Sequence, residues 1–379
     1  MNILTNEEKI WVDSQWEKLD KKLSKIAVRS REKIPFHSTD FMHDNRGGEL
    51  IHLWTNGFWP GLMWLMYIGT KNDEYKKTAE TTEKWLDEAM STPERLGHDV
   101  GFMWRLASGP HYEIDKNQES WNRMRRAANV LMARYNPAGG FIRAWNWGAT
   151  KGEKAGWTII DTMMNLPLLY WASLQDEDPR FKMAAMNHTD KAMTSHVRPD
   201  GSVRHVVKHD PFTGEFIGED ETACQGYGVD SSWSRGQAWA LYGFILGYIH
   251  TGKQEYLDTS KRVAHYFIAN VCKDWLPRAD FRSPAEPVYY DTSAAGCAAC
   301  GLIEIAKIVP EFEKRMYLDA AISILKATEQ FADWTTDTDY IIGMASGAYN
   351  NEQNSNFIFA DYYYAEAIYK LKGFEPLFW

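Results

Sequence analysis

The sequence predicts an all-α protein, an (α/α)6 barrel in which six helical hairpins close into an inner and an outer ring. Three observations carry this prediction: an apolar segment recurs six times, amphipathic segments of helical period alternate with it, and no convincing run of alternating apolar and polar residues predicts a sheet. The chain has 379 residues, of which 44% are hydrophobic, enough to bury a substantial core. We expect a single domain over residues 1–379, since one barrel accounts for this length.

The inner ring is expected from segments that are apolar nearly all round. They are rich in glycine, alanine and aromatic residues, as helices buried on every side should be. They lie at residues 57–69, 100–108, 160–173, 235–250, 292–308 and 361–371.

The outer ring is expected from amphipathic segments that alternate with the apolar ones. In 253–271, for example, Tyr256, Val263 and Phe267 recur at helical spacing with charged residues between them. These segments lie at 72–90, 116–135, 178–196, 253–271 and 312–332, and a sixth at 6–30 can close the ring. Short strands are allowed at 139–145 and 201–209.

A helical-repeat solenoid is the alternative to a closed ring. The apolar segments start 43 to 75 residues apart, which is too uneven for a solenoid of fixed period. Long insertions such as 198–234 favour loops over one face, as the mouth of an active site requires.

Composition and charge exclude several classes of protein. A net charge of -9 disfavours a nucleic-acid partner, which needs clustered Lys and Arg. Neither a signal peptide nor an apolar run long enough to cross a bilayer is found, so no membrane partner is expected. The four cysteines, Cys224, Cys272, Cys297 and Cys300, form no disulfide framework, which favours the cytoplasm. Cys297 and Cys300 form a CxxC without a second pair, so we expect no metal site there.

Aromatic residues are numerous, with 17 Trp, 19 Tyr and 17 Phe. They indicate either a large aromatic core or a cleft whose flat faces suit sugar rings, and composition does not separate the two.

Polar side chains stand at or near the start of each apolar segment: Asn56, Asp99, Asp161, Asp230, Asp291 and Asp361. Helix capping is expected for most of them. If the inner helices run in one direction, these side chains and the positive helix ends converge on one mouth. Asp161 stands out because almost no other charge lies nearby, and a carboxyl in apolar surroundings can keep its proton near neutrality, as a general acid must. Asp99 is a candidate second carboxylate.

Five motifs occur in order along the chain: WTNGFWPGLMWL (54–65), GHDVGFMWRL (97–106), IIDTMMNLPLLYWA (159–172), DSSWSRGQAWALYGF (230–244) and DYYYAEAI (361–368). Together they resemble the unsaturated glucuronyl hydrolases, glycoside hydrolase family 88, from about residue 50 to the end. The resemblance implies the six-hairpin barrel and a hydrolase that releases a terminal 4,5-unsaturated uronic acid from lyase-generated oligosaccharides of glycosaminoglycan type. It implies hydration of the C4=C5 vinyl ether, with no nucleotide or metal cofactor.

The resemblance also implies roles for individual residues. Asp161 matches the acid that protonates C4, and Asp99 matches its partner carboxylate. The positions that match the pocket lining are Trp54, His98, Trp145, His205, Gln225, Arg235, Trp239 and Tyr349. His209 is an alternative to His205, Trp54 and Trp239 could equally be core residues, and Arg235 could pair with Asp230 or hold the substrate carboxylate.

One departure from the family concerns sulfate. Relatives that accept sulfated disaccharides carry serine and lysine before the last inner helix, whereas no Lys, Arg or His lies between Lys326 and Lys370 here. We therefore expect poor recognition of a sulfated neighbouring sugar. The sequence is compatible with a monomer or a homodimer.

Three other functions compete with this interpretation. An unsaturated rhamnogalacturonyl hydrolase would use similar chemistry on pectin fragments, but the HDVGF motif and the pair Asp99 and Asp161 favour the glucuronyl activity. A sugar epimerase would need histidine bases in the cavity. A non-catalytic carbohydrate-binding barrel would use the aromatic cleft without turnover.

Overall fold

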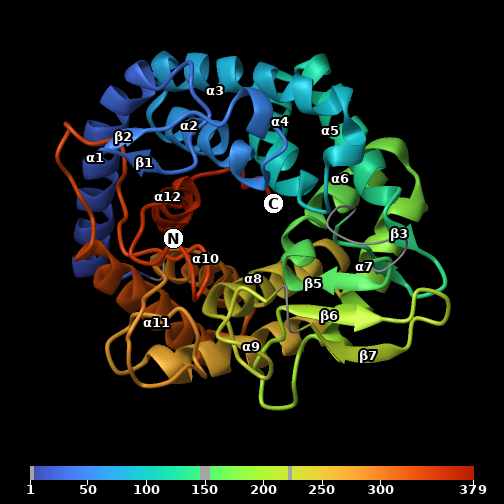
Figure 1. The fold of residues 1–379 in the computed structure, drawn as a ribbon. Helices are drawn as coiled ribbons and strands as arrows, with labels where there is room; N and C mark the ends of the chain where they lie inside the picture. The colour runs from blue at the N-terminus through green and yellow to red at the C-terminus, as the bar shows by residue number, and fades with distance from the viewer. Residues whose placement is uncertain (1–3, 146–153, 221–223) are drawn as a thin grey trace.

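The predicted double ring of helices is confirmed by a computed structural model, which describes residues 4–145, 154–220 and 224–379. The inner helices are α2 (Phe58–Thr70), α4 (Leu106–Asp115), α6 (Pro167–Asp176), α8 (Ser234–Thr251), α10 (Thr292–Ile308) and α12 (Ile358–Lys372). The outer helices are α1 (Asn6–Arg29), α3 (Asp73–Trp85), α5 (Gln118–Met132), α7 (Pro179–Ser195), α9 (Gln254–Val271) and α11 (Glu311–Glu329). Figure 1 looks into the ring, with the outer helices along its periphery.

Burial explains why the two kinds of segment take different layers. In α10, every residue from Thr292 to Ala306 is buried, so a helix with almost no polar face is stable only inside the ring. The outer helices bury one face each, and four of them begin at turns capped by a side chain. Thr5 and Glu8 form a reciprocal capping box at α1, and Asn72, Asn117 and Asp178 cap α3, α5 and α7.

The N-terminal helix closes the ring, as its amphipathic pattern predicts. The Nε1 of Trp11 donates to the Glu329 carboxylate of α11 at 2.9 Å, which joins the first helix to the last outer one. On its other side, the Tyr75 hydroxyl of α3 donates to the Asp20 carboxylate at 2.7 Å. Helix α1 therefore bridges elements that stand at opposite ends of the sequence.

Two inner segments begin irregularly, which changes their predicted limits. The second starts with a π-helical turn, Gly101–Arg105, before α4, and the third starts with a 3-10 turn, Ile160–Met164, before α6. Proline at position 167 has no N–H to donate, and it stands at the first position of α6, where none is needed. The regular helices therefore begin later than 100 and 160, and the irregular turns face the mouth.

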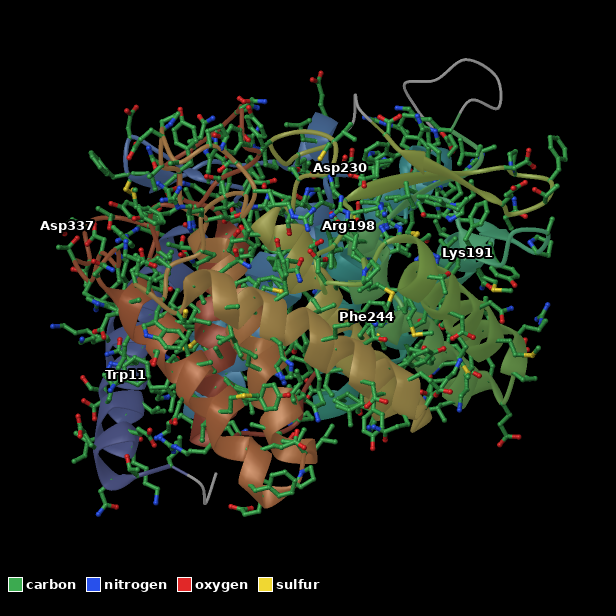
Figure 2. All side chains as sticks on the ribbon, turned by 90° about the horizontal axis from the view of Figure 1, so that it is seen from below. Trp11, Lys191, Arg198, Asp230, Phe244 and Asp337 are labelled. Carbon is green, nitrogen blue, oxygen red and sulfur yellow. The ribbon has the colours of Figure 1, made fainter. Side chains whose placement is uncertain are left out.

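Short antiparallel strands lie at one end of the barrel. β5 (Trp157–Ile159), β6 (Val206–His209) and β7 (Phe216–Glu219) form a sheet in that order. Two smaller pairs are β1 (Ser38–Thr39) with β2 (Met42–His43), and β3 (Tyr135–Asn136) with β4 (Phe141–Ile142). Figure 2 shows this sheet and the long loops, including the one labelled at Asp230, gathered at the same end. The strand expectations at 139–145 and 201–209 contain β4 and β6, whereas the other five described strands were not expected.

In the described ranges, no helix has both the length and the apolar character that crossing a membrane demands.

The two cysteines of the CxxC sequence lie inside the barrel. Cys297 and Cys300 are fully buried in α10, and burial raises the pKa of both thiols. Their surroundings therefore oppose the thiolate form that metal binding or redox exchange requires.

The entry to α2 predicts a test of the packing at the mouth. A Cβ on Gly57 would lie 2.1 Å from the Phe102 carbonyl oxygen and 2.3 Å from that of Met103, and neither backbone group can move freely. Gly57→Ala should lower the free energy of unfolding by about 2 kcal/mol or more. Gly228→Ala, where the added carbon meets nothing within 4 Å, is the control in urea unfolding. Equal stability of the two variants would contradict this account.

Candidate active site

The starts of four inner helices meet at one cavity in the mouth of the barrel. The residues that line it are Trp54, His98, Asp99, Trp145, Ile159, Asp161, Gln225, Trp233, Arg235 and Trp239. Trp54 precedes α2, Asp99 precedes the turn into α4, Asp161 lies in the turn before α6, and Arg235 lies in the first turn of α8. Eight of the ten predicted site residues line this cavity, and His205 and Tyr349 do not.

Asp99 and Asp161 face this cavity from neighbouring helix starts. Burial raises the pKa of both carboxyls, and the charge of Asp161 raises that of Asp99 further. The positive charge of Arg235 offsets part of this rise in the pKa of Asp161. Within the described part of the chain, Asp161 Oδ1 has no hydrogen-bond partner. Because two like charges in a desolvated site disfavour double ionisation, the pair is suited to sharing one proton near neutral pH.

Two neutral histidines stand behind the carboxylates. Burial lowers the pKa of His98 well below its ordinary value and that of His205 to about 3. His98 Nε2 lies 3.4 Å from Asp99 Oδ2, while its Nδ1 contacts the Thr162 hydroxyl at 2.7 Å. His205 Nδ1 accepts the backbone N–H of Gln225 at 3.1 Å, so a neutral ring carries its proton on Nε2, 3.6 Å from Asp161 Oδ1.

His209 takes no part in this arrangement. It lies on β6 and stacks on Phe141, with 5.1 Å between ring centroids. Of the two histidines that the sequence left open, His205 is the one that approaches Asp161. His98 and His205, the histidines next to the two carboxyls, are poor bases at neutral pH, which argues against the epimerase alternative.

Arg235 does not pair with Asp230, which corrects one of the two expectations for this side chain. Its Nη1 donates to Asp291 Oδ2 at 2.7 Å in a fully buried ion pair, and its Nη2 donates to the Gly347 carbonyl oxygen at 2.6 Å. Asp230 instead lies in the exposed loop before α8. The guanidinium is thus a fixed positive group in the cavity wall, committed largely to protein acceptors.

Aromatic rings form the walls of the cavity. Trp239 is buried, Trp54 is half-buried, and their ring centroids lie 6.4 Å apart in a T-shaped arrangement. Both rings pack in the core and also line the cavity, so the core role and the pocket-lining role expected for these tryptophans do not exclude each other. Trp145 is half-buried on another side, and the Lys154 ammonium lies 5.1 Å from its ring centroid.

Tyr349 lies behind the cavity wall instead of lining it. Its backbone N–H donates to the Gln225 carbonyl oxygen at 2.8 Å, and its ring packs edge-on against Tyr227 and Tyr289. Gln225 Nε2 in turn donates to the Gly347 carbonyl oxygen at 2.9 Å. Tyr349 therefore supports the loop that carries Gln225.

Helix capping is wrong as the general explanation of the rim residues. Asp291 alone among the described rim residues caps a helix, accepting a backbone N–H at the start of α10 at 3.1 Å. Asp361 lies inside α12 and accepts N–H groups of the preceding loop, and Asn56 donates to carbonyls of its own loop. Because the segments before the inner helices fold back as loops and turns, Asp99 and Asp161 face the cavity instead.

Sequence reasoning missed two lining residues and two that support them. Trp233 lies 4.5 Å from His205 between ring centroids, and Ile159 ends β5 at the cavity wall. Thr162 and Asn165 contact the residues around the carboxylates. Trp233 belongs to the motif DSSWSRGQAW and Asn165 to IIDTMMN, so both lay inside segments already singled out.

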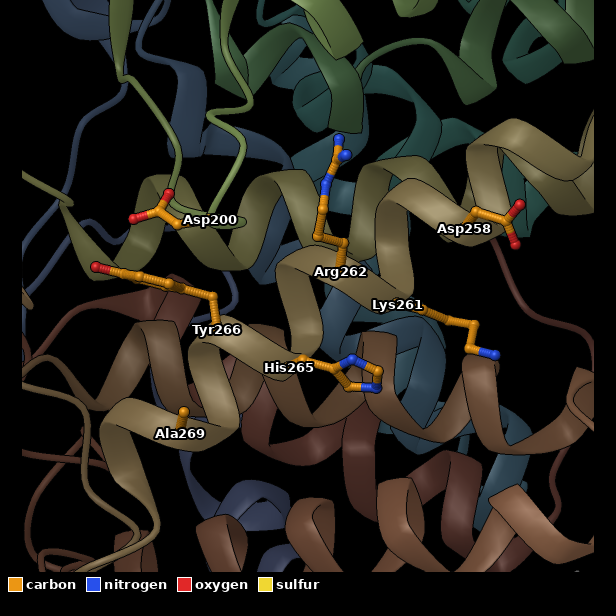
Figure 3. Close-up of a pocket in the computed structure, with 7 residues that line it drawn as sticks. All are labelled: Asp200, Asp258, Lys261, Arg262, His265, Tyr266 and Ala269. Carbon is orange, nitrogen blue, oxygen red and sulfur yellow. The ribbon is translucent and has the colours of Figure 1, made fainter.

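A second hollow lies on the outer surface of α9 and is unrelated to this cavity. Figure 3 shows its side chains pointing in different directions along the helix instead of converging. They belong to Asp200, Asp258, Lys261, Arg262, His265, Tyr266 and Ala269. An open groove with divergent groups does not provide the enclosed, convergent setting that chemistry needs.

One cluster of metal-ligating side chain types stands apart from the mouth, where α3 meets α4. Glu80, His111 and Asp115 lie close together there. Lys76 already pairs with Asp115 at 2.6 Å, and His111 Nδ1 contacts the Glu83 carboxylate at 2.6 Å. These ion pairs account for the cluster as a link between the two helices.

The chain is similar to known proteins over most of its length. It is 35% identical to the unsaturated glucuronyl hydrolase of Bacillus sp. strain GL1, over 86% of this chain and 88% of that protein. It is 33% identical to the unsaturated chondroitin disaccharide hydrolase of Streptococcus pyogenes serotype M1, over 85% of this chain and 82% of that protein. The crystal structure of the Bacillus sp. GL1 hydrolase, described as responsible for the degradation of glycosaminoglycan, matches with a TM-score of 0.87 and 32% identity, covering 94% of this chain and 97% of that one. No family model matches the chain.

The raised pKa values predict how stability depends on pH. Because folding raises the pKa of Asp99, the folded state binds more protons than the unfolded state above about pH 4, and stability falls as pH rises towards neutrality. Asp99→Asn should raise Tm at pH 8 by about 2–4 °C and change it by less than about 1 °C at pH 5. Thermal unfolding followed by circular dichroism measures this, with exposed Asp258→Asn as the control. A Tm increase of the same size at both pH values would contradict the burial argument.

Proposed function

Because the chain belongs to the unsaturated glucuronyl hydrolase family, we propose that it releases the terminal 4,5-unsaturated uronic acid from lyase-generated, glycosaminoglycan-type oligosaccharides. This is the activity of glycoside hydrolase family 88. The observation that carries the proposal is the pair Asp99 and Asp161, two desolvated carboxyls that share a small cavity with aromatic walls. The neutral histidines His98 and His205 stand beside them. Such a pair supplies an acid and a carboxylate at the same pH.

The reaction begins with a proton transfer from Asp161 to C4 of the unsaturated sugar. The C4=C5 electron pair forms the new C4–H bond, and positive charge develops at C5 and the ring oxygen. Water then adds at C5 while the Asp161 carboxylate takes up its proton, which restores the acid. The product is a hemiketal. Its C5–O bond to the ring oxygen breaks to give a ketone at C5, and the C1–O bond to the neighbouring sugar then breaks to give an aldehyde and the shortened sugar.

The surroundings of the carboxylates fit this sequence of steps. His205 Nε2 lies 3.6 Å from Asp161 Oδ1, beyond hydrogen-bond distance, and burial keeps this ring neutral, so it does not exchange protons with the carboxyl at neutral pH. Ionised Asp99 stabilises positive charge that develops on the sugar ring. The indole rings of Trp54 and Trp239 offer the flat apolar faces against which a sugar ring packs.

An anionic substrate must enter a protein of net charge -9, so local positive groups are needed. Arg235 is fixed in the cavity wall by Asp291 and backbone carbonyls, and it supplies such a charge without having to be reorganised. Lys154 stands over Trp145 and Trp157 at 5.1 and 4.9 Å from their ring centroids. Both support capture of the uronic acid carboxylate.

The cytoplasm is the proposed place of action. All four cysteines are free thiols, which is typical of proteins from reducing compartments. Substrate would then have to reach the enzyme as a small imported oligosaccharide.

Asp161→Asn tests the assignment of the acid. An amide cannot deliver the proton to C4, so kcat should fall by about 10³-fold or more while KM stays within about threefold of the parent. Turnover is measured as loss of the ultraviolet absorbance of the C4=C5 bond with an unsaturated chondroitin disaccharide. Asp258→Asn, on the exposed face of α9, is the control. An Asp161→Asn enzyme that keeps full activity would exclude Asp161 as the acid.

Sulfate on the neighbouring sugar should weaken turnover. The segment between Lys326 and Lys370 contains no Lys, Arg or His to neutralise it. We expect kcat/KM for the 6-sulfated unsaturated chondroitin disaccharide to be about tenfold or more below that for the unsulfated one, which corresponds to about 1.4 kcal/mol of transition-state binding. Parallel kinetics on the two disaccharides decide this, and a preference for the sulfated sugar would refute it.

A further inference from the structure

Asn165 is a buried amide that joins the two segments carrying the catalytic carboxyls. It has no exposed surface and lies at the end of the 3-10 turn Ile160–Met164. Its Nδ2 lies 3.3 Å from Asp99 Oδ1 and 3.1 Å from the Asp161 carbonyl oxygen. Its Oδ1 accepts the backbone N–H of Phe102 at 2.9 Å. Every polar atom of this side chain is therefore used between the two segments.

These partners admit one orientation of the amide. The Phe102 N–H can only donate and the Asp161 carbonyl can only accept, so the amide oxygen must face Phe102 and the NH2 must face Asp161. The second N–H of that group then points at Asp99. A donor thus reaches Asp99, whereas Asp161 Oδ1 has no hydrogen-bond partner in the described chain.

The backbone around Asn165 is packed to hold this arrangement. A Cβ on Gly101 would lie 2.6 Å from the Asn165 Cα and 2.7 Å from its Oδ1. Glycine at 101 therefore lets the segment that follows Asp99 lie directly on Asn165. This close packing fixes the position of the amide beside Asp99.

We propose that Asn165 is a positioning residue for the reaction: its amide orients Asp99, favours the ionised form of that carboxyl and so leaves the shared proton to Asp161. The proposal rests on the proposed function, because it assigns Asp161 as the acid. A hydrogen bond donated to a carboxylate stabilises its charged form, while Asp161 receives no such bond from Asn165. The side-chain amide therefore lowers the pKa of Asp99, against burial and the charge of Asp161, which both raise it.

A purely structural role is the alternative, and two variants separate the roles. Asn165→Ala removes all three contacts. Asn165→Asp keeps the shape and the acceptor for the Phe102 N–H, and it replaces the donor to Asp99 by a further carboxyl. If Asn165 acted only as a packing group, Asn165→Asp should retain most of the activity with an unchanged pH profile.

The closing experiment measures kcat, KM and their pH dependence on an unsaturated chondroitin disaccharide. For both variants we expect kcat to fall about 100-fold, KM to stay within about threefold, and the pH profile to move up by about one pH unit. Asn56→Ala is the matched control, because Asn56 is equally buried but donates only to the carbonyls of Leu50 and Ile51. It should lower Tm without moving the pH profile.

A second readout does not depend on turnover. Losing the donor raises the pKa of Asp99 in the folded state further, so Asn165→Ala should lose more stability between pH 5 and pH 8 than the parent does. Unchanged pH dependence of both activity and unfolding in Asn165→Ala, or the same shift in Asn56→Ala, would overturn the proposal. The two proposals can also fail separately. If the parent enzyme does not cleave the disaccharide, the proposed function is refuted. If Asn165→Ala still shows the altered pH dependence of unfolding in that case, the link between Asn165 and Asp99 stands.

Discussion

The desolvation of Asp99 and Asp161 at the mouth of the barrel is the constraint on which the site depends. In water both carboxyls would be ionised at neutral pH, and neither could act as an acid. Enclosure by aromatic walls makes the second charge costly, so one proton is retained. The histidines follow the same rule in the opposite sense, because burial keeps His98 and His205 uncharged. One physical effect therefore prepares an acid, a carboxylate and two neutral histidines.

The double ring creates this enclosure by bringing four helix starts to one point. Inner helices such as α8 and α10 are apolar on all sides and are stable only when the outer ring covers them. Their starts then meet where the loops are longest, and irregular turns before α4 and α6 aim the carboxyls inwards. Arg235 is held at the same place by Asp291, so a fixed, buried ion pair stands in the cavity wall beside the two carboxyls.

Most residues of the site belong to motifs that could be singled out in the sequence, but the contacts between these residues could not be predicted from it. Asp161 could be recognised as unusual because its neighbours in sequence are apolar, and that local signal persists in the fold. The ion pair of Arg235 with Asp291 could not be found in this way, since 56 residues separate the two. Tyr349 lies behind Gln225 because its loop packs on that backbone, and no local pattern carries this information.

Periodicity and apolar content determined, from the sequence by itself, that this chain forms helical hairpins with an inner and an outer layer, since each helix records in its side chains which faces it buries. The ordered motifs determined the family and the candidate carboxyls. Tertiary structure alone decided which rim residues cap helices, which histidine approaches Asp161, and that Asn165 donates to Asp99. Those outcomes depend on distances between segments far apart in the chain, which packing of the closed ring sets and local composition does not encode.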